Sequence, residues 1–254
     1  MRDMTNSIAL VREPGASFVH AIWQHTEKNT IDVERAREQH RLYTETLKDM
    51  GLSVVHLKID ETYPDGPFVE DTAIALPDRA WLCSLKAESR RGETETVFNE
   101  IKKYRPVVTI RPPAYIDGGD VLNIDGTLYV GLSSRTNREA IEILRLHHPV
   151  IPVPVRRGLH LKSSVSHLGG KTLVINPENV EPTAFAKFDR VVADKHENAN
   201  CLSFGGKVLM AAGYPLLADR IRRKGFEVVE LPIGEFEKAD GGITCLSLII
   251  PLYS

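Results

Sequence analysis

Two carboxylates stand side by side in the first of four short motifs that could carry chemistry, residues 68–76 (FVEDTAIAL). Glu70 and Asp71 come directly before a run of strand-forming residues. Adjacent carboxylates beside a strand suit a planar cation such as a guanidinium, whose N–H donors need planar acceptors. A capped turn with a solvated acid pair is the alternative interpretation. Asp65 lies in the preceding turn, where aspartate is a preferred turn residue.

The second motif, residues 116–122 (IDGGDVL), places two glycines between two acids. Glycine lets the backbone turn sharply between Asp117 and Asp120, so an acid can point into a cavity. A purely structural turn explains the pattern equally well. Because no further ligands lie nearby in the sequence, we predict no metal site.

The third and fourth motifs supply a histidine and a cysteine. His160 lies in GLHLKSS and Cys245 in EKADGGITCLSLII. A lone histidine is more often a hydrogen-bonded structural residue than a base, and free cysteine is among the most buried residue types, so both have structural alternatives. Cys83 and Cys201 are widely spaced and form no C-x-x-C pair, which argues against a disulfide framework or a thiolate zinc site.

The four motifs together indicate nucleophilic catalysis. A nucleophilic cysteine needs a base and an orienting acid, which are separate in sequence and joined by the fold. Each motif lies at the start of a predicted strand. If repeated units surround an axis, equivalent positions converge on one central cavity, where these side chains would meet: Glu70, Asp71, Asp117, His160 and Cys245.

Helices and strands alternate along the chain. The most regular helical pattern covers residues 31–50, and Gly51 follows it as a stop signal. Further helices are predicted at residues 94–104, 137–147 and 216–224. Strands are predicted at residues 52–59, 107–110, 150–155 and 226–231. The fold class is therefore mixed α and β.

Glycine pairs recur along the chain, each before a β-rich run. They lie at residues 118–119, 169–170, 205–206 and 241–242, and Glu70-Asp71 stands as a degenerate fifth copy. Recurrence at this scale suggests repeated supersecondary units around an axis, although glycine pairs are also common turns. Five units of strand, helix and strand would fill the chain. No Ser/Gly/Pro-rich linker divides it, so we predict a single domain over residues 1–254.

The composition excludes several classes of protein. A total of 32 basic and 34 acidic residues gives a net charge of −2, which offers nucleic acid little electrostatic attraction. Hydrophobic residues make up 42%, enough to bury a core. No apolar run reaches the roughly 18–20 residues that span a bilayer, and no signal-peptide core follows Arg2 and Asp3. We therefore expect a cytoplasmic protein with neither membrane nor nucleic-acid partners.

The motifs, in this order, resemble the dimethylarginine dimethylaminohydrolase family of the guanidino-group-modifying (pentein) superfamily. FVED, SRRGE at residues 89–93, DGGDVL, GLSSRTN at residues 131–137, GLHLKS and EKADGGITCLS carry the resemblance, which extends over residues 32–250. It implies an α/β fold, a five-bladed pseudo-symmetric ββαβ propeller with the active site in its central cavity.

The resemblance also implies a role for each residue. Cys245 would be the nucleophile, His160 the general acid and base, and Asp117 the acid that orients His160. The substrate-binding residues are Asp71 with Glu70 for the guanidinium, Arg90 and Arg135 for the carboxylate and Asp65 for the α-amino group. Phe68 and Ala239 are further substrate-binding residues. Two arginines beside one aspartate complement an amino-acid zwitterion.

The implied reaction is hydrolysis of Nω-methylated arginine, asymmetric dimethylarginine or monomethylarginine, to citrulline and dimethylamine or methylamine. The Cys245 thiolate would attack the guanidinium carbon and leave a covalent thiouronium, with His160 moving the protons. A bound guanidinium would lower the pKa of the Cys245 thiol, so the substrate would activate its own nucleophile. No metal or organic cofactor is implied, and the expected partner is this small-molecule substrate; a homodimer is left open.

Two alternatives stay open. The first alternative is an arginine deiminase-like hydrolase that acts on another guanidino compound. Arginine deiminases carry an acid two residues after the catalytic histidine, where this chain has Lys162, and they add a helical insertion. A non-catalytic propeller that binds a macromolecule is the second alternative, but it gives no reason to keep a cysteine, a histidine and an acid. Residues 13–30, where the family places a substrate lid, match poorly. His20 and Trp23 are the lid candidates, with Trp23 near a position expected to be aliphatic.

Overall fold

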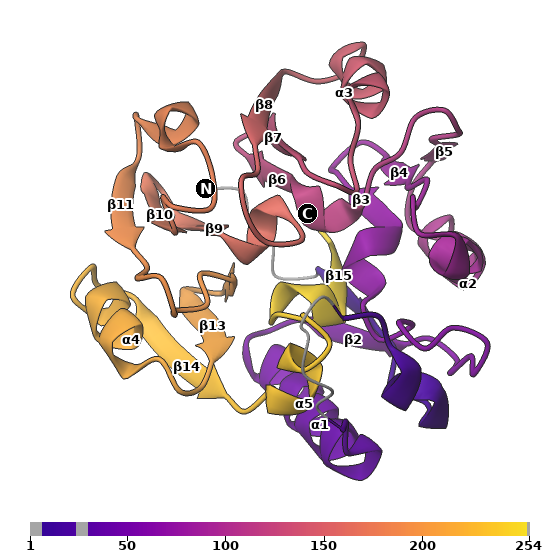
Figure 1. Cartoon of the computed structure of the whole chain (residues 1–254), viewed down its shortest axis with the longest axis horizontal. Coiled ribbons are helices and arrows are strands. Elements are labelled where there is room, and N and C mark those ends of the chain that lie inside the picture. The colour runs from indigo at the N-terminus through magenta and orange to yellow at the C-terminus, as the bar shows by residue number, and fades with distance from the viewer. Residues whose placement is uncertain (1–6, 24–29, 253–254) are drawn as a thin grey trace.

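Five small sheets surround a central axis in the computed structural model, which describes residues 7–23 and 30–252 (Figure 1). Each sheet has three strands. The middle strand pairs antiparallel with one neighbour and parallel with the other, which is reached through a crossover. The repeated unit is therefore ββαβ, and the predicted five-bladed propeller is confirmed.

Four sheets are built from consecutive strands: β3 (Ala73–Ala75), β4 (Ala80–Leu82) and β5 (Val107–Thr109); β6 (Val121–Ile124), β7 (Thr127–Leu132) and β8 (Val150–Pro154); β9 (Val165–Gly169), β10 (Thr172–Ile175) and β11 (Asp189–Val192); and β12 (Cys201–Phe204), β13 (Lys207–Ala211) and β14 (Glu227–Leu231). The fifth sheet joins β15 (Ser247–Ile250), β1 (Ile8–Val11) and β2 (Ser53–His56). Ile8 pairs with Ile250 across it, so the two ends of the chain close the ring.

Helices lie outside the sheets, in the crossovers (Figure 1). They are α1 (Val33–Asp49), α2 (Thr94–Ile101), α3 (Arg138–Arg145) and α4 (Pro215–Arg222), with a short α5 (Gly234–Glu237) after β14. Asp32 caps α1 by accepting from Arg35 N at 3.1 Å, and Gly51, with φ +96°, follows its end. A 3₁₀ turn at Pro182–Phe185 takes the place of an α-helix in the β10–β11 crossover. All four predicted helices are present.

The core is divided among the junctions between neighbouring blades. Tyr43 and Leu47 of α1 pack with Phe236 in one buried cluster. Trp81 and Leu144 belong to another. The residues of each cluster come from distant parts of the chain, so the hydrophobic effect holds the blades against one another.

The five inner strands, β3, β6, β9, β12 and β15, are each preceded by a short turn, and we call these five segments the inner turns. Four are 3₁₀ turns: Val69–Thr72, Gly118–Asp120, Leu161–Ser163 and Thr244–Leu246. The fifth ends at Asn200, before β12. Because the inner turns are equivalent by pseudo-symmetry, they bring distant residues to one region.

The glycine pairs mark the repeat less regularly than predicted. Gly118-Gly119 and Gly241-Gly242 do lie at inner turns. Gly169-Gly170 and Gly205-Gly206 instead form the hairpins between the first two strands of their blades, with φ values of +121°, +55°, +59° and +82°. Each pair does come before a strand, as predicted, but these strands are not equivalent in the repeat, because two of the pairs meet the hairpin's need for positive φ.

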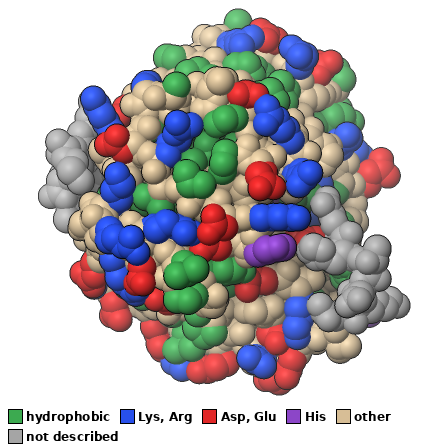
Figure 2. All heavy atoms as spheres, turned by 60° about the vertical axis from the view of Figure 1, so that its left-hand side comes forward, with side chains coloured by type: hydrophobic (Ala, Val, Ile, Leu, Met, Phe, Trp, Pro, Cys, Tyr) green, Lys and Arg blue, Asp and Glu red, His purple; other side chains and the backbone are tan. Residues whose placement is uncertain are grey.

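The molecular surface mixes charges. On the face shown in Figure 2, lysine and arginine side chains lie among aspartates and glutamates, so neither sign dominates. Within residues 7–23 and 30–252, none of the helices combines the length and apolarity that crossing a membrane requires.

Candidate active site

One small pocket gathers side chains from two of the inner turns and from His160, which directly precedes a third. Its lining includes eight of the residues predicted from sequence: Asp65, Phe68, Asp71, Arg90, Arg135, His160, Ala239 and Cys245. The pocket volume is about 20 Å³, which is room for a single water molecule. A ligand the size of an amino acid can therefore bind only if part of the wall moves.

His160 stands between two carboxylates. Its Nε2 lies 3.0 Å from Asp117 Oδ2, and its Nδ1 lies 3.8 Å from Asp71 Oδ1. The ring is buried, with 3% of the residue exposed. Burial lowers the pKa of His160, but Asp71, Asp117 and Asp120 outweigh it and raise the pKa to about 9. The imidazole is therefore protonated at neutral pH, ready to donate a proton.

Asp71 is held by a buried arginine. Arg90 Nη1 donates to Asp71 Oδ2 at 2.7 Å, while Arg90 Nη2 donates to Glu93 Oε2 at 2.8 Å and to the Phe68 carbonyl at 3.2 Å. Burial alone would raise the pKa of Asp71, but His160 and Arg90 outweigh it and keep that pKa below its usual value. Asp71 is thus an ionised acceptor on the pocket wall.

The glycine pair at residues 118–119 is needed for close approach. A Cβ on Gly119 would lie 2.8 Å from both Asp71 Oδ1 and His160 Nδ1. Gly119 N also donates to Asp71 Oδ1 at 3.2 Å. Neither glycine adopts positive φ, so the predicted reason, backbone freedom, was wrong. The absence of side chains lets three inner turns meet.

Asp120, the second acid of the same motif, ties two loops together. Its Oδ2 accepts from Ser133 Oγ at 2.6 Å and from Thr136 Oγ1 at 2.7 Å, and its Oδ1 accepts from Leu161 N at 2.9 Å. The first two residues flank Arg135, and the third follows His160. Asp120 therefore fixes the loops that carry a predicted substrate ligand and the predicted base.

Cys245 is half-buried on the inner turn before β15. Gly242 N donates to its Sγ at 3.3 Å. Burial, together with Glu70 and Asp71, raises the pKa of the thiol, so the resting side chain is protonated. Cys83 and Cys201 are buried, and burial raises the pKa of each.

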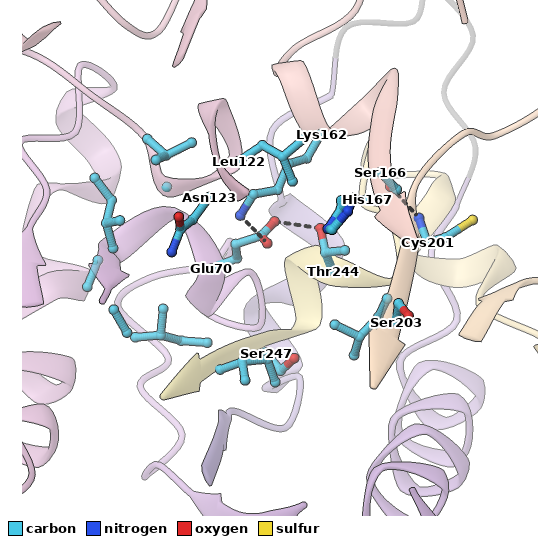
Figure 3. Close-up of a pocket in the computed structure, with 18 of the residues that line it drawn as sticks. Glu70, Leu122, Asn123, Lys162, Ser166, His167, Cys201, Ser203, Thr244 and Ser247 are labelled. Atoms are coloured by element: carbon cyan, nitrogen blue, oxygen red, sulfur yellow. Dashed lines mark hydrogen bonds and ion pairs between the residues drawn. The ribbon is translucent and has the colours of Figure 1, made fainter. Parts of the chain in front are cut away.

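Glu70 faces away from the small pocket. Its Oε1 accepts from Lys162 Nζ at 2.8 Å and its Oε2 from Thr244 Oγ1 at 2.7 Å. These residues border a second cavity of about 340 Å³ among the inner strands, where Figure 3 shows both contacts. The larger cavity is thus separate from the cluster around His160. The role predicted for Glu70 at the guanidinium remains a prediction.

Of the segment predicted as a lid, residues 24–29 lie outside the described residues. His20 is exposed at the end of the 3₁₀ turn Ala16–His20, and Trp23 is half-buried. Ile22 is the aliphatic residue of this segment that lines the pocket, and its N–H donates to Asp65 Oδ1 at 3.1 Å. Burial raises the pKa of Asp65, which is 5% exposed.

Four pocket-lining residues were not predicted from sequence: Ile22, Leu159, Asp240 and Gly241. Gly241 belongs to a glycine pair that the sequence does single out, and Leu159 adjoins His160. The aliphatic residue that the family resemblance leads one to expect near Trp23 is the signal that could have indicated Ile22.

The ligand-type atoms of Asp71, Asp117 and His160 lie within 4.8 Å of one another. Three such groups could in principle hold a metal ion. A metal would have to displace a proton from His160, because metal ligands must be deprotonated, and it would stand near the Arg90 guanidinium that Asp71 already holds. The arrangement suits proton transfer better.

Comparisons with known proteins point to one family. Residues 12–200 match the family described as N,N dimethylarginine dimethylhydrolase, eukaryotic. The N(G),N(G)-dimethylarginine dimethylaminohydrolase of Streptomyces coelicolor is 35% identical over 253 residues, covering 96% of this chain and 97% of the relative.

Solved structures of similar proteins point to the same family. A dimethylarginine dimethylaminohydrolase in an adduct with S-methyl-L-thiocitrulline has a TM-score of 0.92 at 31% identity, covering 98% of this chain and 100% of the other. A mutant of the Pseudomonas aeruginosa protein complexed with citrulline has a TM-score of 0.88 at 31% identity, covering 96% and 98%.

Proposed function

The chain belongs to the dimethylarginine dimethylaminohydrolase family, and on that premise we propose that it hydrolyses asymmetric dimethylarginine and monomethylarginine to citrulline and the corresponding amine. One observation carries the proposal: a thiol and a protonated imidazole, paired with a carboxylate, line one pocket together with two arginines and an aspartate. This set matches both ends of a methylated arginine.

The guanidinium end of the substrate is matched by buried carboxylates. Asp71 is ionised and buried, and Asp117 Oδ1 is buried without a hydrogen-bond partner among the described residues. A buried carboxylate oxygen without a donor is costly, and a guanidinium N–H would satisfy it. Buried carboxylates suit a planar cation better than a neutral ligand, which supports the guanidinium-binding role that the resemblance implies for Asp71.

The amino-acid end is matched by charge. Arg135 lies at the same pocket with its Nη1 3.7 Å from Asp117 Oδ2, and that nitrogen is buried without a hydrogen-bond partner among the described residues. In our proposal Arg135 and Arg90 bind the carboxylate, and Asp65 binds the α-amino group. Most N–H groups of Arg90 already serve Asp71 and Glu93, so we expect Arg135 to be the stronger carboxylate ligand. Phe68 and Ala239 form apolar parts of the wall.

The first half-reaction transfers the guanidinium carbon to sulfur. Substrate binding brings a cation beside Cys245 and offsets the carboxylates that raise the pKa of its thiol. The thiol releases its proton to solvent as the cation binds, and the thiolate forms a bond to the guanidinium carbon. The bond from that carbon to the methylated nitrogen breaks, and the His160 proton goes to the departing amine. A covalent thiouronium remains on Cys245.

The second half-reaction uses water. His160, now neutral and oriented by Asp117, takes a proton from a water molecule as its oxygen bonds to the same carbon. The carbon–sulfur bond then breaks and the remaining hydroxyl proton passes to sulfur, which releases citrulline and restores the thiol. Every step is supplied by these side chains and water.

The proposal includes the surroundings of the site. Residues 1–254 form one catalytic domain with a small-molecule partner, and residues 13–30 form a lid. Ile22 would move with that lid, since the pocket has room for only about one water molecule. Glu61 accepts from Ala16 N at 2.9 Å and Ser17 N at 2.7 Å, so it anchors the start of the lid.

The test is incubation of the protein with asymmetric dimethylarginine, monomethylarginine and arginine in parallel. Citrulline is scored in all three, with dimethylamine, methylamine and ammonia as the paired products. We expect citrulline from the methylated substrates. Product from arginine alone would replace the proposal by a deiminase, and no citrulline from any of them would refute it.

A further inference from the structure

One inner turn has no part in the chemistry described above. Three inner turns carry Asp71, Asp117 beside Gly118, and Cys245, and His160 directly precedes a fourth. The fifth, before β12, ends at Asn200. Asn200 is buried, with 2% exposed, and in sequence its blade lies between the one that His160 precedes and the one that Cys245 precedes. Pseudo-symmetry therefore places Asn200 beside both predicted catalytic turns.

The Asn200 side chain bonds to both of those turns. Its Oδ1 accepts from Thr244 N at 2.8 Å, and its Nδ2 donates to Thr244 Oγ1 at 2.9 Å and to the Lys162 carbonyl at 2.9 Å. Since a backbone N–H can only donate and a carbonyl can only accept, these partners fix the orientation of the amide. Thr244 immediately precedes Cys245, and Lys162 lies two residues after His160.

The same two turns are joined a second time through Glu70. Its carboxylate accepts from Lys162 Nζ at 2.8 Å and from Thr244 Oγ1 at 2.7 Å, as Figure 3 shows. Asn200 and Glu70 thus each bridge Lys162 and Thr244, and the four residues form a closed hydrogen-bonded ring that we call the clasp. A ring of this kind restrains the two turns more strongly than a single bond.

We propose that Asn200 is a positioning residue that sets the placement of the nucleophile Cys245 relative to the base His160 through the clasp. The inference rests on the proposed function, because it assumes that those two residues act together. Asn200 touches neither the pocket nor its predicted ligand, so its effect passes through Thr244 and Lys162.

The packing around Asn200 leaves little room for another geometry. A Cβ on Gly242 would lie 2.6 Å from Asn200 Oδ1, so the amide rests directly on the backbone whose N–H donates to Cys245 Sγ. A shift of the amide would therefore move the thiol's own hydrogen-bond donor. Misplacement of a reacting group by about 1 Å can cost about 100-fold in rate.

The experiment compares Asn200→Ala with a matched control, Asn176→Ala. Asn176 is also 2% exposed and uses its side chain on backbone groups, with Nδ2 3.4 Å from the Asp194 carbonyl, in the neighbouring blade. We expect Asn200→Ala to lower kcat about 100-fold with KM little changed, and Asn176→Ala to leave kcat near wild type. Equal kcat losses in both variants, or none in Asn200→Ala, would overturn the proposal.

A second variant and a substrate-free measurement keep the outcome clear. Asn200→Asp serves if Asn200→Ala does not fold. Its side chain has nearly the same shape and keeps an acceptor for Thr244 N, but it lacks both N–H donors, so we expect the same loss of kcat. Labelling of Cys245 by iodoacetamide, followed by peptide mass, needs no turnover. We expect faster labelling in the Asn200 variants because the loosened turn exposes the thiol.

The two proposals fail in different ways. A wild-type protein that forms no citrulline refutes the proposed function, and Cys245 labelling then decides whether the clasp restrains the thiol. An active wild type whose kcat and Cys245 labelling are unchanged by Asn200→Ala refutes the clasp alone.

Discussion

Replacing Asp117 by asparagine removes one of the two carboxylate charges beside His160 and leaves the side-chain volume almost unchanged. Asp117 Oδ2 lies 3.0 Å from His160 Nε2. An asparagine oxygen can still accept from that nitrogen, so the ring keeps a partner but loses the ionic part of the contact. The substitution therefore tests the electrostatics of the site with little change in packing.

The size of the effect on folding stability follows from the shift in the pKa of His160. The pKa of His160 is raised from 6.5 to about 9, and each unit corresponds to about 1.4 kcal/mol, so the protonated ring contributes about 3 kcal/mol to stability. Asp71 provides the largest raising effect, followed by the Asp117 hydrogen bond. A hydrogen bond to a charged group is worth about 1.5–3 kcal/mol, so Asp117→Asn should remove a large part of this contribution.

The sign of the pH dependence is fixed by the direction of the shift. Because the pKa in the folded state lies above the unfolded value, the contribution is fully present below pH 6.5 and is lost as the pH rises through about 9. The free energy of unfolding of Asp117→Asn should therefore fall furthest below that of the wild type at about pH 6, and the gap should narrow towards about pH 10.

Two measurements check this prediction. An NMR titration should show His160, assigned by the loss of its signal in His160→Gln, titrating at lower pH in Asp117→Asn, and kcat should fall about 10²–10⁴-fold. Asp189→Asn, at an exposed strand position, is the control and should change neither. A His160 pKa near 6.5 in the wild type, or a stability gap that does not depend on pH, would refute the reasoning.

The remaining predictions concern the nucleophile, a buried ion pair and a close approach. Cys245→Ser should abolish turnover while calorimetry still detects citrulline binding, and Cys83→Ser, at a buried thiol outside the pocket, should change neither. Arg90→Ala removes the partner of buried Glu93 and one of the two cations beside Asp71, so chemical denaturation should show a loss of about 3–5 kcal/mol; a loss below 1 kcal/mol would contradict the buried network. Gly119→Ala would place a Cβ 2.8 Å from Asp71 Oδ1, so kcat should fall steeply, and full activity would contradict the close approach.

Local signals were enough to predict much of the fold. The helix predicted at residues 31–50 is found at Val33–Asp49, because Asp32 caps it and Gly51 supplies the positive φ that ends it. The number of blades was also predicted correctly. The glycine pairs proved less reliable as markers of the repeat, because they serve both hairpins and inner turns. Sequence alone does not separate a glycine needed for positive φ from one needed for close approach.

In the candidate site, too, some residues have a local signal in the sequence and others are placed only by the closed ring. His160, Cys245 and Asp71 could be named because motif order and residue type indicate them, and the structure brings them to one pocket. The direction in which Glu70 points depends on ring closure, because its partners Lys162 and Thr244 are far away in sequence. Asn200 has no local signal at all, since its partners are likewise set only by the closed ring.

The central claim is that the inner turns of this ring bring Cys245 to the carbon of a methylated guanidinium, and mass spectrometry of the acid-quenched enzyme tests it most directly. The protein is mixed with asymmetric dimethylarginine that carries an isotopic label in the guanidinium carbon, quenched during turnover and digested. The account predicts that the label is attached to the peptide containing Cys245 and that the attached group has lost dimethylamine. Labelled citrulline that forms while the Cys245 peptide never carries the label, or a label on Cys83 or Cys201 instead, would contradict it.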